Sequence, residues 1–209
     1  MHTTPIKCLN SLKTEFKTLR LFDDKNQNIF SGGSSAKGLT KSQMFYLTEA
    51  IFFASFRCYE QFLRNVFLLY CCGRQSSGRK SVRSYLQPKN IKHAEMLVKS
   101  SMPFLDWSSP DVLIERTESY LKDGYPMKIP LSTNIENLRD LKKIRNHIAH
   151  MSRESTSDFT RVVRSHYGTR PLNLPRPGEY LLLSCRNNSS TYYLEKYMKV
   201  MEDVAEKVT

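Results

Sequence analysis

The sequence lacks the features that mark exported and membrane-spanning proteins. Its longest strongly apolar run, Ala50 to Phe56, is bounded by Glu49 and Arg57. That run is far shorter than the roughly 20 apolar residues that a membrane-spanning helix needs. No segment combines a basic start, an apolar run and a small-residue cleavage site, as a secretory signal does. We therefore expect a cytoplasmic protein with no part in a membrane.

The sequence also lacks the cysteine pattern of a disulfide framework or a zinc site. Its cysteines are odd in number and include an adjacent pair, which suits reduced thiols in the cytosol, and no C-x2-C pair is present. His147 and His150 can supply half of a metal site, but no carboxylate or cysteine stands at a helpful nearby spacing. We therefore expect neither a metal nor a cofactor. The cysteines are Cys8, Cys58, Cys71, Cys72 and Cys185.

Several enzyme motifs are missing as well. There is no G-x-S-x-G nucleophile motif, and the segment 31–38, SGGSSAKG, lacks the G-K-[ST] ending of a phosphate-binding loop. Acidic residues are few: 20 Asp and Glu stand against 32 Lys and Arg, which gives a net charge of +12. This excess favours a polyanionic partner, although charge alone does not separate RNA, DNA and an acidic protein.

Apolar residues recur at helical spacing along most of the chain. Residues 23–41 are polar and predict a loop, and Tyr125 to Pro130 is expected to be extended. Prolines and Gly178 exclude a helix from 169–185, where Tyr180 to Cys185 is predicted as a short strand or an extended flap. The predicted helices cover residues 6–22, 42–72, 84–101, 109–122, 133–150 and 158–167, and a last helix is capped within Asn187 to Ser190.

The predicted elements define an all-α fold, a helical bundle with elaborations. At 209 residues, the chain has the size of one ordinary domain and can form a core without disulfide or metal cross-links. We therefore expect a single domain over residues 1–209.

The predicted helix 133–150, TNIENLRDLKKIRNHIAH, carries the most informative pattern. Thr133 and Glu136 have the spacing of a capping box. Arg145 falls on the apolar stripe, where a guanidinium is costly unless it is paired or reaches water along its stem. Asn146 and His150 share a face, whereas Arg145 and His150 lie about 140° apart around the helix axis. The stripe consists of Ile135, Leu138, Leu141, Ile144, Ile148 and Met151.

A second charge stands in apolar surroundings within the predicted helix 42–72. Glu60 lies among aromatic residues in ASFRCYEQFLRNVF, where a carboxylate needs a positive partner. One hypothesis is that Glu60 pairs with or orients Arg145. The alternative is a pair within the helix, with Arg57 or Arg64. The helix pattern by itself also fits an arginine that reaches out to water and a partly exposed histidine near a helix end.

The segment RNHIAH resembles the signature of the HEPN superfamily (higher eukaryotes and prokaryotes nucleotide-binding). Ribonucleases of that family carry an arginine, a polar residue directly after it, and a histidine after a gap of four to six residues. Arg145, Asn146 and His150 match these three positions. The preceding LRDLKKI is similar to the helix that leads into the motif, and the surroundings of Glu60 resemble the first core helix of several HEPN families.

The resemblance implies an up-and-down bundle of four or five helices with its core at about residues 41–150. The helix 5–22 and the segment 151–209 are then additions to that core. The resemblance further implies a homodimer, in which two motifs meet across a two-fold axis to form one composite site. It implies an endoribonuclease that works without metal and leaves 2′,3′-cyclic phosphate or related ends. Such enzymes act as toxins or as antiviral abortive-infection effectors, so an antitoxin or a regulatory partner protein is expected.

The residue types suit this chemistry. RNA carries its own nucleophile, the 2′-OH beside each phosphate, so the protein must move protons and stabilise charge on the phosphoryl oxygens. His150 can take or give a proton near neutral pH. The planar fork of Arg145 can hold two phosphate oxygens, and Asn146 can orient the imidazole or contact the phosphate.

Two other functions fit parts of the pattern. The first is a non-catalytic HEPN-type module that binds RNA or assembles with a partner protein, although the presence of both Arg145 and His150 argues against it. The second is a helical DNA-binding regulator, for which the sequence offers no convincing helix-turn-helix spacing.

Overall fold

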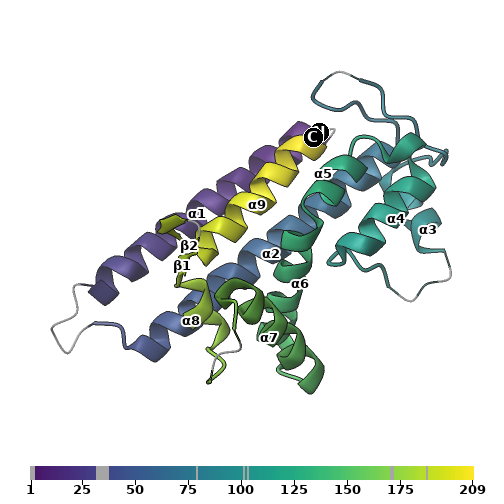
Figure 1. Ribbon diagram of the computed structural model, residues 1–209. Coiled ribbons are helices and arrows are strands. Elements are labelled where there is room, and N and C mark those ends of the chain that lie inside the picture. Colours follow the sequence, from purple (N-terminus) through teal and green to yellow (C-terminus); the bar gives the residue numbers. More distant parts are fainter. Residues whose placement is uncertain are drawn as a thin grey trace. The chain divides into compact units, whose positions relative to one another are not determined.

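The computed structural model describes residues 3–31, 38–78, 80–100, 102, 104–169, 172–186 and 188–209. Within these ranges the chain is mostly helical with one small two-stranded sheet (Figure 1), which confirms the all-α class. No helix there combines the length and the apolar character that crossing a bilayer requires. The elements are α1 Pro5–Ser31, α2 Lys41–Cys71, α3 Ile91–Lys99, α4 Pro110–Tyr120, the 3-10 helix η1 Lys122–Gly124, α5 Lys128–Thr133, α6 Ile135–His150, α7 Arg153–Tyr167, α8 Pro177–Leu181, β1 Ser184–Cys185, β2 Asn188–Tyr192 and α9 Tyr193–Val208.

The chain divides into two compact units. The first unit comprises Met1–Thr14, Cys58–Arg139 and Val200–Thr209, and the second comprises Glu15–Arg57 and Asp140–Lys199. The helices α1, α2, α6 and α9 therefore contribute residues to both units.

The first unit contains buried polar anchors as well as an apolar core. The fully buried Tyr70 of α2 donates its hydroxyl to the carbonyl oxygen of Val208 at 2.7 Å, which fixes the end of α9. The guanidinium of Arg116 lies 4.5 Å from the ring centroid of Trp107 and donates to the carbonyl oxygen of Asp106 at 2.8 Å. These contacts satisfy an arginine that is almost completely buried on α4.

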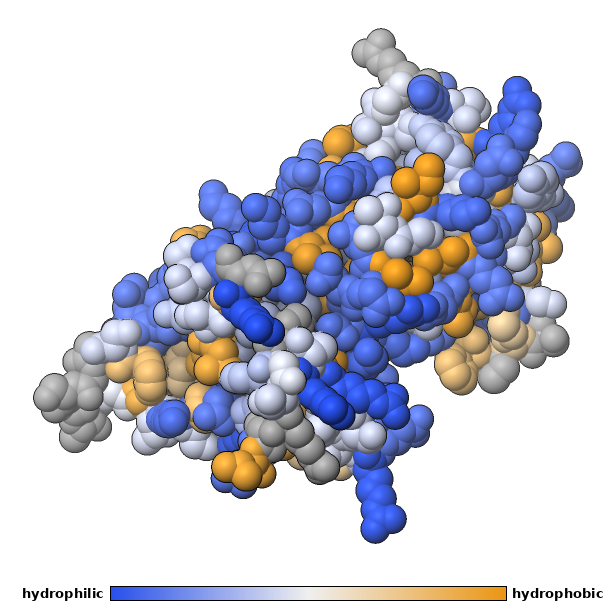
Figure 2. Space-filling model, viewed as in Figure 1, coloured by the Kyte–Doolittle hydropathy of each residue, from blue (hydrophilic) through white to orange (hydrophobic). Residues whose placement is uncertain are grey.

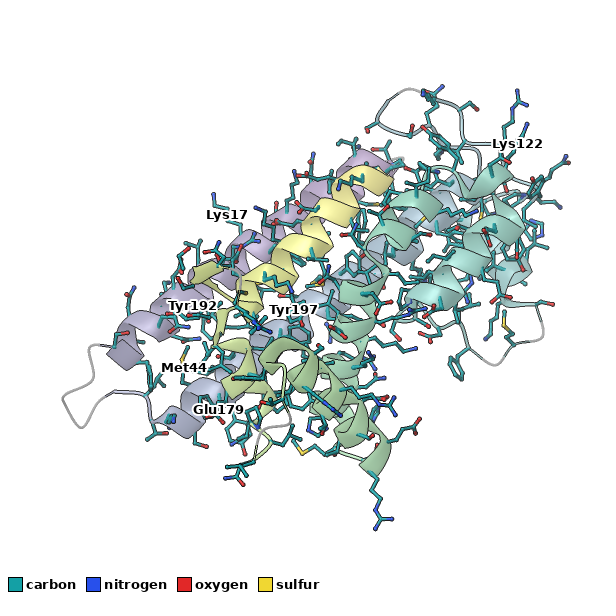
Figure 3. The ribbon with its side chains drawn as sticks, in the orientation of Figure 1. Lys17, Met44, Lys122, Glu179, Tyr192 and Tyr197 are labelled. Carbon is teal, nitrogen blue, oxygen red and sulfur yellow. The ribbon has the colours of Figure 1, made fainter. Side chains whose placement is uncertain are left out.

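The core of the second unit is rich in aromatic rings. Tyr180 of α8 stacks on Tyr193 with a centroid distance of 4.7 Å and meets Phe159 of α7 edge-on at 5.7 Å. Tyr197 of α9 is directed toward α2 (Figure 3), where its ring meets Phe52 edge-on at 6.3 Å. The hydroxyl oxygens of Tyr180 and Tyr197 are 3.3 Å apart, so each phenol has a polar partner inside the core.

Gly178 lets α8 pack directly against α2. Its backbone N–H donates to Oε1 of the buried Glu49 at 3.0 Å. A Cβ at this position would collide with the backbone carbonyl of Phe45. Two residues before Gly178, the Arg176 guanidinium lies 4.1 Å from the ring centroid of Tyr46. Arg176 and the first turn of α8 are therefore bound to α2 by a cation–π contact, a hydrogen bond and close backbone packing.

The sequence predicted α2 and α4 well. The observed α2, Lys41–Cys71, differs by one residue at each end from the predicted 42–72, and Pro110 opens α4 as expected. The predicted loop 23–41 is wrong at its start, because α1 continues through Ser31. Within the second unit, Asn26 in this extension is 5% exposed, and Arg20, about one turn before the extension, binds Glu195 at 2.9 Å. Tertiary packing therefore supports a helix that the polar sequence does not predict. Residues 32–37 of the predicted loop lie outside the described residues, residues 38–40 are not helical, and Lys41 begins α2.

The start of the motif helix also differs from the prediction. Thr133 is the last residue of α5, where its hydroxyl donates to the carbonyl oxygen of Ile129 at 2.8 Å, and Glu136 accepts from Arg139 at 2.6 Å. The capping box is therefore wrong. The expected extended segment 125–130 is wrong at its end, since Pro130 lies in the first turn of α5, where a missing N–H costs no helical hydrogen bond.

The C-terminal quarter contains more regular structure than expected. Pro177 opens the helix α8, because proline fits the first helical position, so the exclusion of helix from this region is wrong. The predicted strand within 180–185 is reduced to Ser184–Cys185, which pairs antiparallel with Asn188–Tyr192, a segment expected to cap the last helix.

Three helix starts are displaced from their predicted positions. The cap of α3 is Asn90, whose side chain accepts from the N–H of His93, so this helix is shorter than the predicted 84–101. Ser152 caps α7, which begins at Arg153, five residues before the predicted start at 158. Helix α9 begins only at Tyr193.

Replacing Gly178 with alanine is expected to lower the free energy of unfolding by about 1–3 kcal/mol, because the added methyl group meets backbone that cannot rotate away. Urea denaturation measures the change. Gly78→Ala is the matched control: its Cβ would lie 3.9 Å from Ser76 Oγ, an ordinary contact, so its effect should stay within about 0.5 kcal/mol. Equal midpoints for both variants would contradict the close packing of α8 on α2.

Candidate functional site

The last three turns of α6 carry the candidate site residues. Leu138, Leu141 and Ile144 are buried, as the apolar stripe predicted, whereas Ile135 and Ile148 are half-buried. Met151 departs from that prediction, since it follows the helix with φ +46° and is 62% exposed. The helix thus ends at His150, and the chain turns within Met151 and Ser152 into α7.

Arg145 is half-buried and held from two directions. Its guanidinium carbon lies 5.7 Å from the ring centroid of Phe53 and 5.9 Å from that of Phe56, both on α2. Its Nη1 donates to Oδ1 of the neighbouring Asn146 at 3.0 Å. Cation–π contacts of this kind contribute about 0.5–2 kcal/mol, depending on desolvation. The arginine is therefore oriented by its surroundings while part of it stays accessible to solvent.

His150 occupies the opposite kind of environment. It is the exposed last residue of α6, and the helix geometry separates it by about 140° from Arg145 around the axis. Within one chain, the imidazole and the guanidinium therefore point to different sides of the same helix. Asn146, which is half-buried, accepts a hydrogen bond from Arg145 and lies one turn before His150 on the same face of the helix.

Glu60 is half-buried on α2 and belongs to the first unit, whereas Arg145 belongs to the second. The pairing of Glu60 with Arg145 stays a prediction. For the alternative partner Arg64, the structure gives a contact that the sequence did not indicate: its Nη2 lies 2.6 Å from Oε1 of Glu95 on α3.

His147 has a structural role that the sequence did not indicate. It is 9% exposed, its ring stacks on Phe159 of α7 at 4.9 Å, and its Nδ1 lies 3.4 Å from Oγ of Ser155. Burial lowers the pKa of His147 below its ordinary value of 6.5. The side chain thus packs α7 against the end of α6. In the described part of the chain, no three His, Cys, Asp or Glu side chains gather as a metal ion would require.

Sequence reasoning missed the aromatic platform under Arg145. Phe53 and Phe56 are three residues apart on α2 and so face the same side, which is a signal present in the sequence. What the sequence does not give is the helix that this side meets. The sequence likewise identifies Ser155 and Phe159 only as a polar and an apolar residue of α7. Their contacts with His147 become apparent only when α6 is placed beside α7.

The folded state is expected to lose stability as the pH falls from about 7.5 toward 5, in part through His147. Its pKa is lowered by folding, so below the unfolded-state value the unfolded chain binds more protons and is favoured. Chemical denaturation across this range should give a weaker pH dependence for His147→Gln than for the unchanged chain. If the stability of both proteins depends on pH to the same extent, His147 does not contribute to the pH dependence.

Comparison of the chain with known protein families, with curated proteins and with solved structures finds no match. The functional conclusion therefore depends on the three motif residues of α6 and on the contacts that hold them.

Proposed function

We propose that this chain is a metal-independent endoribonuclease of the HEPN type. The observation that carries the proposal is the arrangement at the end of α6: Arg145 is held by Asn146 and two aromatic rings, and His150 is exposed one turn beyond Asn146. An oriented cation and an accessible imidazole are the two groups that cleavage of RNA by its own 2′-OH requires. The excess of basic residues supports a polyanionic substrate.

In the proposed reaction, the 2′-oxygen attacks the adjacent phosphorus, and the bond from phosphorus to the 5′-oxygen breaks. The proton of the 2′-OH leaves to a base, and the departing 5′-oxygen receives a proton, so the products are a 2′,3′-cyclic phosphate and a 5′-hydroxyl. His150 moves one of these protons. Arg145 binds the non-bridging oxygens, where negative charge accumulates in the transition state.

A single chain offers few groups for two proton transfers, and its Arg145 and His150 point to different sides of α6. A homodimer resolves both difficulties, because an isologous contact brings the motif of one copy against that of its partner. The proposal therefore includes a composite site, an up-and-down bundle around α2 and α6 as the HEPN-like core, and Glu60 as a positioning residue for Arg145.

A ribonuclease of this kind would damage the RNA of the cell that makes it. The proposal accordingly includes restraint by an antitoxin or another regulatory partner, and a biological role as a toxin or an antiviral effector.

Purified protein is expected to cut RNA in the presence of EDTA. His150→Ala should lower the initial rate at least about 100-fold, because a positioned proton-transfer group contributes this much or more. Arg145→Ala should have a loss of similar size, since it removes charge stabilisation in the transition state. The rates are measured on a labelled single-stranded RNA, and circular dichroism checks that each variant is folded.

His93→Ala serves as the matched histidine control, because His93 lies on α3 in the first unit and accepts a backbone N–H of Lys89. It should cleave at the rate of the unchanged chain. Cleavage that needs an added divalent metal contradicts the mechanism. Binding of RNA without cleavage, by the unchanged chain and by His150→Ala alike, would instead support the non-catalytic module.

The active species is expected to have about twice the mass of the 24.3 kDa chain in light scattering coupled to size exclusion. Because each site needs two motifs, the specific activity should fall as the protein is diluted through the dissociation constant of the dimer. A chain that runs as a monomer and keeps its specific activity on dilution contradicts the composite site.

A further inference from the structure

The outward face of α7 presents a row of arginines close to His150. Arg153 and Arg164 lie within about 20° of each other around the helix axis, and Arg161 lies about 80° from Arg153. All three are exposed. The buried residues of this helix are on the opposite side: Ser155, Phe159, Val162 and Val163.

The position of α7 relative to His150 is fixed by contacts within the second unit. Only Met151 and Ser152 separate the two helices, and Ser152 caps α7 by accepting from the backbone N–H of Ser155 at 3.1 Å. The ring of His147 stacks on Phe159. The arginine face therefore begins three residues after the proposed proton-transfer group and extends from it in a defined direction.

The dimensions and the chemistry of this face suit a nucleic-acid strand. From Arg153 to Arg164 the helix rises about 16 Å, a length comparable to several stacked nucleotides. Guanidinium groups bind phosphate oxygens in pairs. At the end of α7, Tyr167 is 47% exposed and offers a ring on which a base can stack. A Cβ on the adjacent Gly168 would lie 3.5 Å from Nη1 of Arg186, so another guanidinium borders this end.

An acidic protein is the alternative binding partner for the arginine face of α7. Protein partners gain most of their affinity from buried apolar and aromatic anchors. The exposed residues of α7 include one large apolar or aromatic side chain, that of Tyr167. Two acidic residues border one edge of the face: Glu154 lies about 100° from Arg153 and about 20° from Arg161, and Asp158 lies about 140° from Arg153 and binds Arg161 at 3.1 Å. Figure 2 shows the surface over α7 as largely hydrophilic. A phosphodiester backbone fits this face better than an apolar partner surface.

We propose that the arginine face of α7, formed by Arg153, Arg161 and Arg164, binds the backbone of the RNA strand that is cut at His150. This inference rests on the proposed ribonuclease function and assigns its substrate-binding surface. The face holds the strand and takes no part in the chemistry.

The test is the triple variant Arg153→Gln, Arg161→Gln and Arg164→Gln. Its matched control is Lys7→Gln, Lys17→Gln and Lys25→Gln, which removes the same charge from exposed positions of α1. Lys17 points outward from that helix (Figure 3). Binding of single-stranded RNA is measured at several salt concentrations in the His150→Ala background, and KM and kcat are measured with His150 intact.

The arginine variant should bind RNA at least about tenfold more weakly at physiological salt. The slope of log Kd against log salt should fall by about 2, because each lost phosphate contact on a single strand removes about 0.7. Its KM should rise while kcat at saturating RNA stays near that of the unchanged chain. The control should stay within about twofold in both assays.

Two other results have separate meanings. If both triple variants bind and cleave RNA equally well, the α7 assignment is wrong and the ribonuclease proposal stands. This result would also favour an acidic protein as the binding partner of the arginine face. If the unchanged chain neither binds nor cleaves RNA, the ribonuclease proposal fails and the α7 assignment fails with it. A large fall in kcat with unchanged KM would also overturn the assignment, since it would place these arginines in the chemistry.

Discussion

The account depends on one constraint, the cost of placing the charge of Arg145 on the apolar side of α6. The structure meets this cost locally, with two phenylalanine rings of α2 and the amide oxygen of Asn146. These contacts limit the rotation of the guanidinium without withdrawing it from solvent. Under the proposed function, this cation binds the phosphate of the substrate.

Helix α6 connects this charge to the rest of the second unit. His147 packs α7 against the same turns of α6 that carry Arg145 and His150. The motif and the arginine face of α7 therefore lie on two helices that pack together. The two histidines differ in burial: His147 is buried and packs against α7, whereas His150 is exposed and accessible to a substrate. Sequence spacing alone does not separate His147 from His150 in this way.

Local patterns predicted the all-α class, the approximate bounds of α2 and α4, and the buried centre of the apolar stripe of α6. They failed where contacts between distant segments decide the outcome. Burial of Asn26 supports the polar end of α1, and the packing on Phe45 selects Gly178 in α8. The capping box failed because α5, which ends at Thr133, takes the threonine hydroxyl. For the site, the sequence singled out Arg145, Asn146, His150 and Glu60, but it could not identify Phe53 and Phe56 as the platform, since that requires the pairing of α2 with α6.

The central claim is that the 2′-OH of the substrate is the nucleophile. The most direct measurement locates a cut site in a defined RNA and then replaces the single ribose on its 5′ side with 2′-deoxyribose, with mass spectrometry of the products. The account predicts a 2′,3′-cyclic phosphate from the all-ribose strand and no cut at the substituted position. Cleavage at the deoxy position, or products with a 3′-hydroxyl, would contradict it.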